Sequence, residues 1–113
     1  MHGNVSFIEL GTSDTERSRS FFQSVFGWDF HPMGEGGGWF QAPSIRVGLH
    51  GADPQPQIYI FFNVPDLERA ILLVREAGGE ADPATPDTPG FGRFSNCRDP
   101  QGIRFGLHQQ PAG

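Results

Sequence analysis

The residues best suited to chemistry lie in a hexapeptide that occurs twice. Residues 45–50 read IRVGLH and residues 103–108 read IRFGLH, so each copy carries an arginine and a histidine at matching places. An imidazole accepts and releases a proton near neutral pH and also binds divalent metals. A guanidinium binds a carboxylate or phosphate through two parallel hydrogen bonds. The repeats therefore supply two bases or ligands and two anion-binding groups: His50, His108, Arg46 and Arg104.

A second repeat shows that the similarity extends along the chain. Residues 14–17 read DTER and residues 66–69 read DLER, and each precedes one copy of the hexapeptide. Two matches in the same order favour an internal duplication. A chain of 113 residues fits one compact domain. We therefore predict a single domain over residues 1–113, made of two related modules, residues 1–54 and 55–113.

Each module has the pattern of a strand, a helix and three further strands. Asp14 and Asp66 are suited to cap the two helices, and Gly27 and Gly78 to end them. The first helix carries an apolar stripe that we expect to be buried: Phe21, Phe22, Val25 and Phe26. The predicted strands comprise residues 5–11, 28–33, 37–42 and 44–50, and then residues 58–64, 80–85, 92–97 and 102–108.

The strands have two different faces, because side chains alternate along a strand. One face is apolar and should form the core under the helices: Ile8, Leu10, Ile45, Val47, Leu49, Ile60, Phe62, Val64, Ile103, Phe105 and Leu107. The other face mixes aromatic, small and ionisable residues: Phe7, Glu9, Arg46, Gly48, His50, Tyr59, Phe61, Asn63, Arg104, Gly106 and His108. Such a mixture is typical of a ligand cavity. We predict an α+β fold in which the two βαβββ modules form a curled sheet around a cavity, with the helices on the outer face.

Three further residues are candidates for contact with a ligand. Trp39 follows a run of glycines, where it would cover the cavity mouth or pack in the core. Phe91 and Arg93 lie in a glycine-rich joint of the second module and are placed for the matching role there.

Composition excludes several classes of partner. The formal net charge is −5, and no run of basic residues is present, so nucleic acid is not an expected partner. The longest apolar stretches fall far short of the roughly 20 residues that span a bilayer. No signal-peptide pattern opens the sequence. The single Cys97 forms no intramolecular disulfide. We expect a cytoplasmic protein that does not bind membranes.

The sequence resembles the vicinal oxygen chelate superfamily, which includes glyoxalase I, bleomycin-resistance proteins and extradiol dioxygenases. The resemblance rests on the doubled βαβββ order, on residues 11–14 (GTSD) followed by Phe21-Phe22 and residues 25–27 (VFG), and on residues 99–102 (DPQG). Residues 89–94 (PGFGRF) and 103–107 (IRFGL) look more narrowly like a glyoxalase-like actinobacterial subgroup.

Members of this family typically hold a divalent metal with one side chain from the first and last strand of each module. The matching positions in this chain are Phe7, Gly48, Tyr59 and Gly106. A phenyl ring and a missing side chain offer no donor atom, and a neutral phenol is a poor ligand. The resemblance therefore implies a protein without a metal or other cofactor at these positions, as bleomycin-resistance proteins can be.

The family's sheet also suggests a replacement for the missing ligands. In that sheet the first and last strands of a module are parallel neighbours, which would place Glu9 beside His50. The pair would act as a general base, form a displaced metal site together with His108, or be an ordinary structural pair.

These observations lead to three hypotheses about function. The first is a metal-free homodimer that binds a small organic ligand, for example to sequester a toxic metabolite or antibiotic. Its ligand would be aromatic or apolar, with an anionic or hydrogen-bonding group. The second is a lyase or isomerase of the glyoxalase type that uses Glu9 and His50 or a relocated metal. The third is a dimerising module without a ligand pocket.

Overall fold

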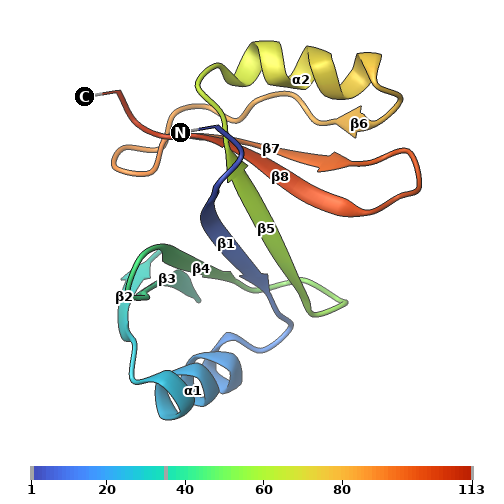
Figure 1. The fold of residues 1–113 in the computed structure, drawn as a ribbon. Helices are drawn as coiled ribbons and strands as arrows, with labels where there is room; N and C mark the ends of the chain where they lie inside the picture. Colours follow the sequence, from blue (N-terminus) through green and yellow to red (C-terminus); the bar gives the residue numbers. More distant parts are fainter. Residues whose placement is uncertain (1, 35, 113) are drawn as a thin grey trace. The chain divides into compact units, whose positions relative to one another are not determined.

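The computed structural model describes residues 2–34 and 36–112. Along the chain, the elements in Figure 1 follow in the order β1 (Val5–Gly11), α1 (Thr15–Phe26), β2 (Asp29–Met33), β3 (Gly37–Gln41), β4 (Arg46–His50), β5 (Gln57–Asn63), α2 (Leu67–Glu76), β6 (Glu80–Ala81), β7 (Arg93–Arg98) and β8 (Arg104–Gln109). Among the described residues, no helix combines the length and apolar character that crossing a membrane requires.

The chain divides into two compact units. The first unit comprises Phe7–Tyr59. The second unit combines the residues up to Ser6 with those from Ile60 onward. The strand order is β2-β3-β4-β1 in one half and β5-β8-β7-β6 in the other. In each half the first strand is parallel to the last, and the other pairs are antiparallel. The α+β class and the doubled βαβββ order are confirmed, whereas the single domain with modules 1–54 and 55–113 stays a prediction.

Both helices begin where their capping residues predict. The Asp14 carboxylate accepts a hydrogen bond from the Arg17 amide at 3.1 Å, and Asp66 accepts one from the Arg69 amide at 3.1 Å. Each bond satisfies an amide that the first helical turn leaves without a partner. Helix α1 ends at Gly27, whose φ of 70° is left-handed. The two predicted helices are therefore confirmed.

One predicted strand is much shorter in the structure, and the limits of the others agree with the prediction to within two residues. The strand predicted over residues 80–85 is only Glu80–Ala81, because Pro83, Pro86 and Pro89 follow and proline cannot donate to a strand partner. The last strand begins at Arg104 rather than at 102. The preceding turn, in which the Gly102 amide donates to the Asp99 carbonyl at 3.0 Å, occupies those residues.

The first unit has a core in which helix α1 takes little part. Its buried residues lie on the strands and just after them, namely Leu10, Phe40, Ala42, Val47 and Leu49. The expectation that the apolar stripe of α1 is buried was wrong, since Phe21, Val25 and Phe26 are 60%, 54% and 55% exposed. The half-buried side of the helix is mostly polar: Thr15, Ser18, Arg19, Phe22 and Gln23.

The polar side of α1 docks through specific contacts. The Arg19 guanidinium lies over the Phe30 ring, 4.9 Å from its centroid. The Gln23 amide donates to the Trp28 carbonyl at 3.3 Å. Together with Phe22, which packs against Phe40 and Trp28, these contacts hold the mostly polar side of the helix against the rest of the unit.

The second unit has its own core, and two residues predicted to belong to it are exposed. Buried residues on β5, α2, β7 and β8 and beside them form the cluster Val64, Leu67, Ile71, Cys97 and Leu107. Ile60 is 38% and Ile103 64% exposed, so their assignment to the core was wrong. Ile103 lies in the turn before β8, where strand alternation does not apply.

Candidate functional site in the first unit

The first feature of the site is a bonded carboxylate and imidazole. In the parallel pair of β1 and β4, Glu9 is opposite Gly48, and Gly11 is opposite His50. This register brings Glu9 Oε2 within 2.6 Å of His50 Nδ1. An ionised carboxylate only accepts, so Nδ1 donates, and Nε2 is the acceptor of a neutral ring. The expectation that Glu9 lies beside His50 is confirmed.

The two members of the pair have different environments. The side chain of Glu9 is 23% exposed and that of His50 is 45% exposed. Burial raises the pKa of the Glu9 carboxyl above its ordinary value, and the hydrogen bond and charge of His50 oppose this only in part. The pair therefore presents an accessible imidazole on a carboxylate that is held out of water.

Asp53 and Tyr59 complete the cluster; Tyr59 was a predicted ligand-binding residue, whereas Asp53 was missed. Asp53 Oδ2 lies 3.7 Å from His50 Nε2 and accepts a hydrogen bond from the Tyr59 hydroxyl at 3.3 Å. The Tyr59 and His50 rings are 6.4 Å apart. Asp53 lies in the loop between β4 and β5, three residues after His50, and its signals in the sequence were this spacing and the following Pro54, which favours a turn.

Two glycines make room for these side chains. A Cβ atom at position 11 would meet Asp53 Oδ2 and would come within 2.9 Å of His50 Nε2. A Cβ atom at position 48 would meet the Glu9 carboxylate and would come within 2.9 Å of the Phe7 ring. Phe7 is itself buried, at 7% exposure. The space of a side chain at position 48 is therefore already filled by Phe7 and Glu9.

The second unit fills the corresponding space with one ring. Phe61 is the register partner of Gly106, and a Cβ atom at position 106 would overlap the Phe61 ring. Phe61 is 5% exposed and packs edge-on against Phe94, with ring centroids 5.3 Å apart. Phe7 and Phe61 were predicted on the ligand face, and both rings are buried because a glycine opens space beneath each.

The metal that the family resemblance implies does not fit the residues at the four family positions. Tyr59 offers a phenol that is bonded to Asp53, Phe7 offers no donor, and positions 48 and 106 are occupied by other side chains. Within residues 2–34 and 36–112, no three or more His, Cys, Asp or Glu side chains are grouped to hold a metal ion.

His108 differs from its repeat partner His50, because both of its ring nitrogens are bonded within the second unit. Nε2 donates to the Phe91 carbonyl at 2.6 Å, and Nδ1 lies 2.8 Å from the Ser6 hydroxyl. The ring is 4% exposed and stacks on Phe94 at 4.5 Å. A contact between His108 and a ligand would require one of these bonds to open.

The predicted aromatic and basic residues are distributed over both units. In the first unit the Arg46 guanidinium lies 5.0 Å from the centre of the Trp39 ring, and Trp39 stacks on His31 at 4.1 Å. Trp39 is the register partner of Gly48, so its side chain is on the Glu9 face of the strands.

In the second unit Arg93 binds Glu68 at 2.9 Å and the Thr85 carbonyl at 3.2 Å. Arg104 is exposed and is the register partner of Arg98.

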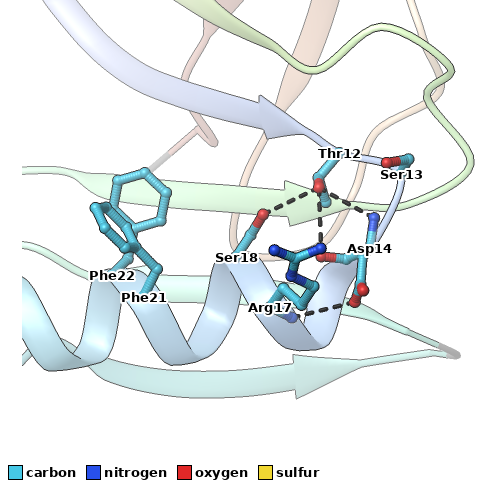
Figure 2. A pocket seen from close by; sticks show the side chains of 7 residues that line it. All are labelled: Thr12, Ser13, Asp14, Arg17, Ser18, Phe21 and Phe22. Atoms are coloured by element: carbon cyan, nitrogen blue, oxygen red, sulfur yellow. Dashed lines mark hydrogen bonds between the residues drawn. The ribbon is translucent and has the colours of Figure 1, made fainter.

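A pocket of about 400 Å³ lies beside the start of α1 (Figure 2). Its lining residues are Thr12, Ser13, Asp14, Arg17, Ser18, Phe21 and Phe22. The Thr12 hydroxyl joins the polar part of the wall, since it accepts from the Ser18 hydroxyl at 2.9 Å and from the Asp14 amide at 3.2 Å. The Asp14 carboxylate is engaged as the helix cap, so this pocket is lined by groups that already stabilise α1.

Solved structures with a similar fold include two enzymes. A variant of homoprotocatechuate 2,3-dioxygenase from Brevibacterium fuscum matches with a TM-score of 0.77 and 18% identity, over 98% of this chain and 34% of that chain. Methylmalonyl-CoA epimerase from Mycobacterium tuberculosis matches with a TM-score of 0.73 and 13% identity, over 96% of this chain and 89% of that chain. At these identities the likeness shows the fold alone.

Similar sequences include two longer bacterial proteins. A protein of Mycobacterium tuberculosis named as a candidate glyoxylase, CFP32, is 27% identical over 95% of this chain and 46% of its own length. The anthracycline biosynthesis protein DauV of a Streptomyces species is 26% identical over 93% of this chain and 41% of its own length. The chain thus spans less than half the length of these relatives.

The family model of the Glyoxalase/Bleomycin resistance protein/Dioxygenase superfamily matches residues 4–107, nearly the whole chain. Together with the doubled βαβββ order, this match shows that the chain belongs to the Glyoxalase/Bleomycin resistance protein/Dioxygenase superfamily.

Proposed function

We propose that this protein binds a small organic molecule without a metal at the positions the family uses. The observation that carries the proposal is the filled space at Gly48 and Gly106. A metal-binding glutamate at either position would have to displace the Glu9 carboxylate and Phe7, or the Phe61 ring. Such displacement would disturb buried residues in both units.

The Glu9 face of the first unit supports a binding role. It combines an accessible imidazole, a desolvated carboxylate and the rings of Trp39 and Tyr59. Sites for small molecules are typically apolar and aromatic surfaces with a few fixed polar groups. By analogy with the bleomycin-resistance proteins of the family, we propose that the ligand is a toxic metabolite or an antibiotic that the protein sequesters.

The first experiment is metal titration of the purified protein, followed by thermal unfolding with Ni²⁺, Zn²⁺, Mn²⁺ and Fe²⁺, with and without EDTA. A metal that binds the folded state at 100 times its dissociation constant adds about 2.7 kcal/mol of stability. We expect no such stabilisation. One tightly bound equivalent of metal that is lost with His50→Ala would overturn the proposal and identify a relocated metal site.

Proton transfer is a second candidate function, favoured by the 2.6 Å bond between Glu9 and His50. A lyase or isomerase of the glyoxalase type needs a base that is accessible to its substrate, and the His50 ring meets this requirement. Loss of a general base lowers turnover by about 10²–10⁴-fold, whereas loss of one binding contact changes affinity only modestly. Once a ligand is known, His50→Ala therefore distinguishes catalysis from binding.

We also propose that the chain forms a homodimer in the cytoplasm. The exposed apolar side chains of α1, which are Phe21, Val25 and Phe26, would gain from burial in such an interface. Sedimentation of a single monomeric species at high protein concentration would contradict this proposal.

A further inference from the structure

The cluster formed by Glu9, His50, Asp53 and Tyr59 contains two acceptor atoms that do not satisfy each other. His50 Nε2 and Asp53 Oδ2 are 3.7 Å apart, which is too far for a hydrogen bond. Because Nδ1 donates to Glu9, Nε2 of the neutral ring has its lone pair directed away from Glu9. A third group that donates hydrogen bonds to both atoms would therefore complete the cluster.

The position of Asp53 is fixed by its own bonds. Its amide donates to the Thr12 carbonyl at 3.1 Å, and its Oδ1 accepts from the Gln55 amide at 3.1 Å. These contacts leave Oδ2 beside His50 and the Tyr59 hydroxyl. The missing Cβ at Gly11 gives Oδ2 and Nε2 the space to approach each other. The loop after β4, together with strands β1 and β4, thus holds the two acceptor atoms in place.

The charge of the cluster selects the kind of head group. The carboxyl groups of Glu9 and Asp53 both face the His50 imidazole, so acidic groups outnumber basic groups in the cluster. The guanidinium on the same face, that of Arg46, lies over the Trp39 ring. A carboxylate or phosphate placed between Nε2 and Oδ2 would be repelled, whereas a cation would be attracted and would also lie near the Tyr59 ring.

We infer that this cluster binds the positively charged, hydrogen-bond-donating head group of an organic ligand, such as a protonated primary amine, between His50 Nε2 and Asp53 Oδ2. The inference rests on the proposed binding function and specifies its ligand class. Asp53 gives the selectivity for a positively charged head group. Tyr59 and Gly11 position the Asp53 carboxylate.

The test uses three probes with the same ring and different head groups: benzylamine, benzyl alcohol and benzoate. Each is titrated into the full chain at constant pH, and the ring signals of His50 and Tyr59 are followed by NMR. We expect benzylamine to shift both sets of signals and to bind about tenfold or more tightly than benzoate, because the two head groups carry opposite unit charges. Benzyl alcohol should lie between them.

Variants then assign the preference to Asp53. Asp53→Asn should lower the ratio of benzylamine to benzoate affinity about tenfold. Asp87→Asn, which changes the net charge equally in an exposed loop, should leave the ratio unchanged. Tyr59→Phe keeps the ring and removes the hydroxyl that holds Asp53, so it should lower the ratio by a smaller factor; it also serves if Asp53→Asn fails to fold.

Each result decides between the inference and the function on which it rests. If benzoate binds as tightly as benzylamine, or if both Asp53→Asn and Tyr59→Phe leave the ratio unchanged, the inference is wrong while the binding function stands. If none of the probes shifts a signal from the Glu9 face, the binding function proposed for that face fails as well.

Discussion

The packing of the Phe61 ring over Gly106 predicts a strong coupling between these two positions. A Cβ atom at position 106 would overlap the ring, and both residues are buried on adjacent strands of the second unit. Overpacking a filled core costs about 1–3 kcal/mol, so Gly106→Ala should lower the free energy of unfolding by that amount. Phe61→Ala removes the obstacle and leaves a cavity that the new methyl group can enter, at a cost of about 3–5 kcal/mol by itself.

The double variant measures whether the ring is the cause. In the Phe61→Ala background, Gly106→Ala should cost close to nothing, which gives a coupling energy of about 1 kcal/mol or more. Urea unfolding of the four proteins measures each free energy. Gly51→Ala is a matched control, because its nearest neighbour is the Thr15 methyl group at 3.1 Å, and its cost should not depend on Phe61. Additive effects of Phe61→Ala and Gly106→Ala would refute the argument that the ring fills the ligand position.

Three further outcomes follow from the structure. The raised pKa of Glu9 means that the folded state holds this proton more tightly than the unfolded state, so its contribution to stability is present at low pH and is lost as the pH rises from 4.5 through the folded value. In urea unfolding from pH 4 to pH 8, Glu9→Gln should remove this fall, and an unchanged profile would contradict the burial argument. His108→Phe should cost about 1–3 kcal/mol, because the buried ring loses its bonds to Phe91 and Ser6, and a neutral effect would mean that water replaces them. In a double-mutant cycle the exposed Arg93–Glu68 pair should contribute less than about 1 kcal/mol, so a larger value would indicate a role beyond the surface.

The regular elements were predictable because their signals are local. Asp14 and Asp66 cap helices through bonds to amides three residues away, and Gly27 ends a helix by adopting a left-handed φ. The parallel pairing of β1 with β4, and with it the contact between Glu9 and His50, came from the family's sheet order. Periodicity alone would have placed both residues on one face without making them neighbours.

The errors arise where a residue's environment depends on packing. The stripe of α1 predicted burial of Phe21, Val25 and Phe26, but the helix docks through its other side, which carries Arg19, Phe22 and Gln23. Strand alternation assigned Ile103 to the core although it lies in a turn. Asp53 was missed because its Asx-turn to Gln55 indicates only a turn, and its amide bond to the distant Thr12 carbonyl has no sequence signature.

The two copies of the hexapeptide have taken different roles, and the difference is local to their histidines. His50 has one nitrogen bonded to Glu9 and one beside Asp53, with nearly half of its side chain exposed. His108 has both nitrogens bonded and is buried. The equivalent of Glu9 in the second unit is Phe61, whose ring covers Gly106 and cannot accept a hydrogen bond. Of the two copies, that of the first unit therefore combines an accessible histidine with a carboxylate, and for this reason we place the candidate site at Glu9 and His50 rather than at the repeat as a whole.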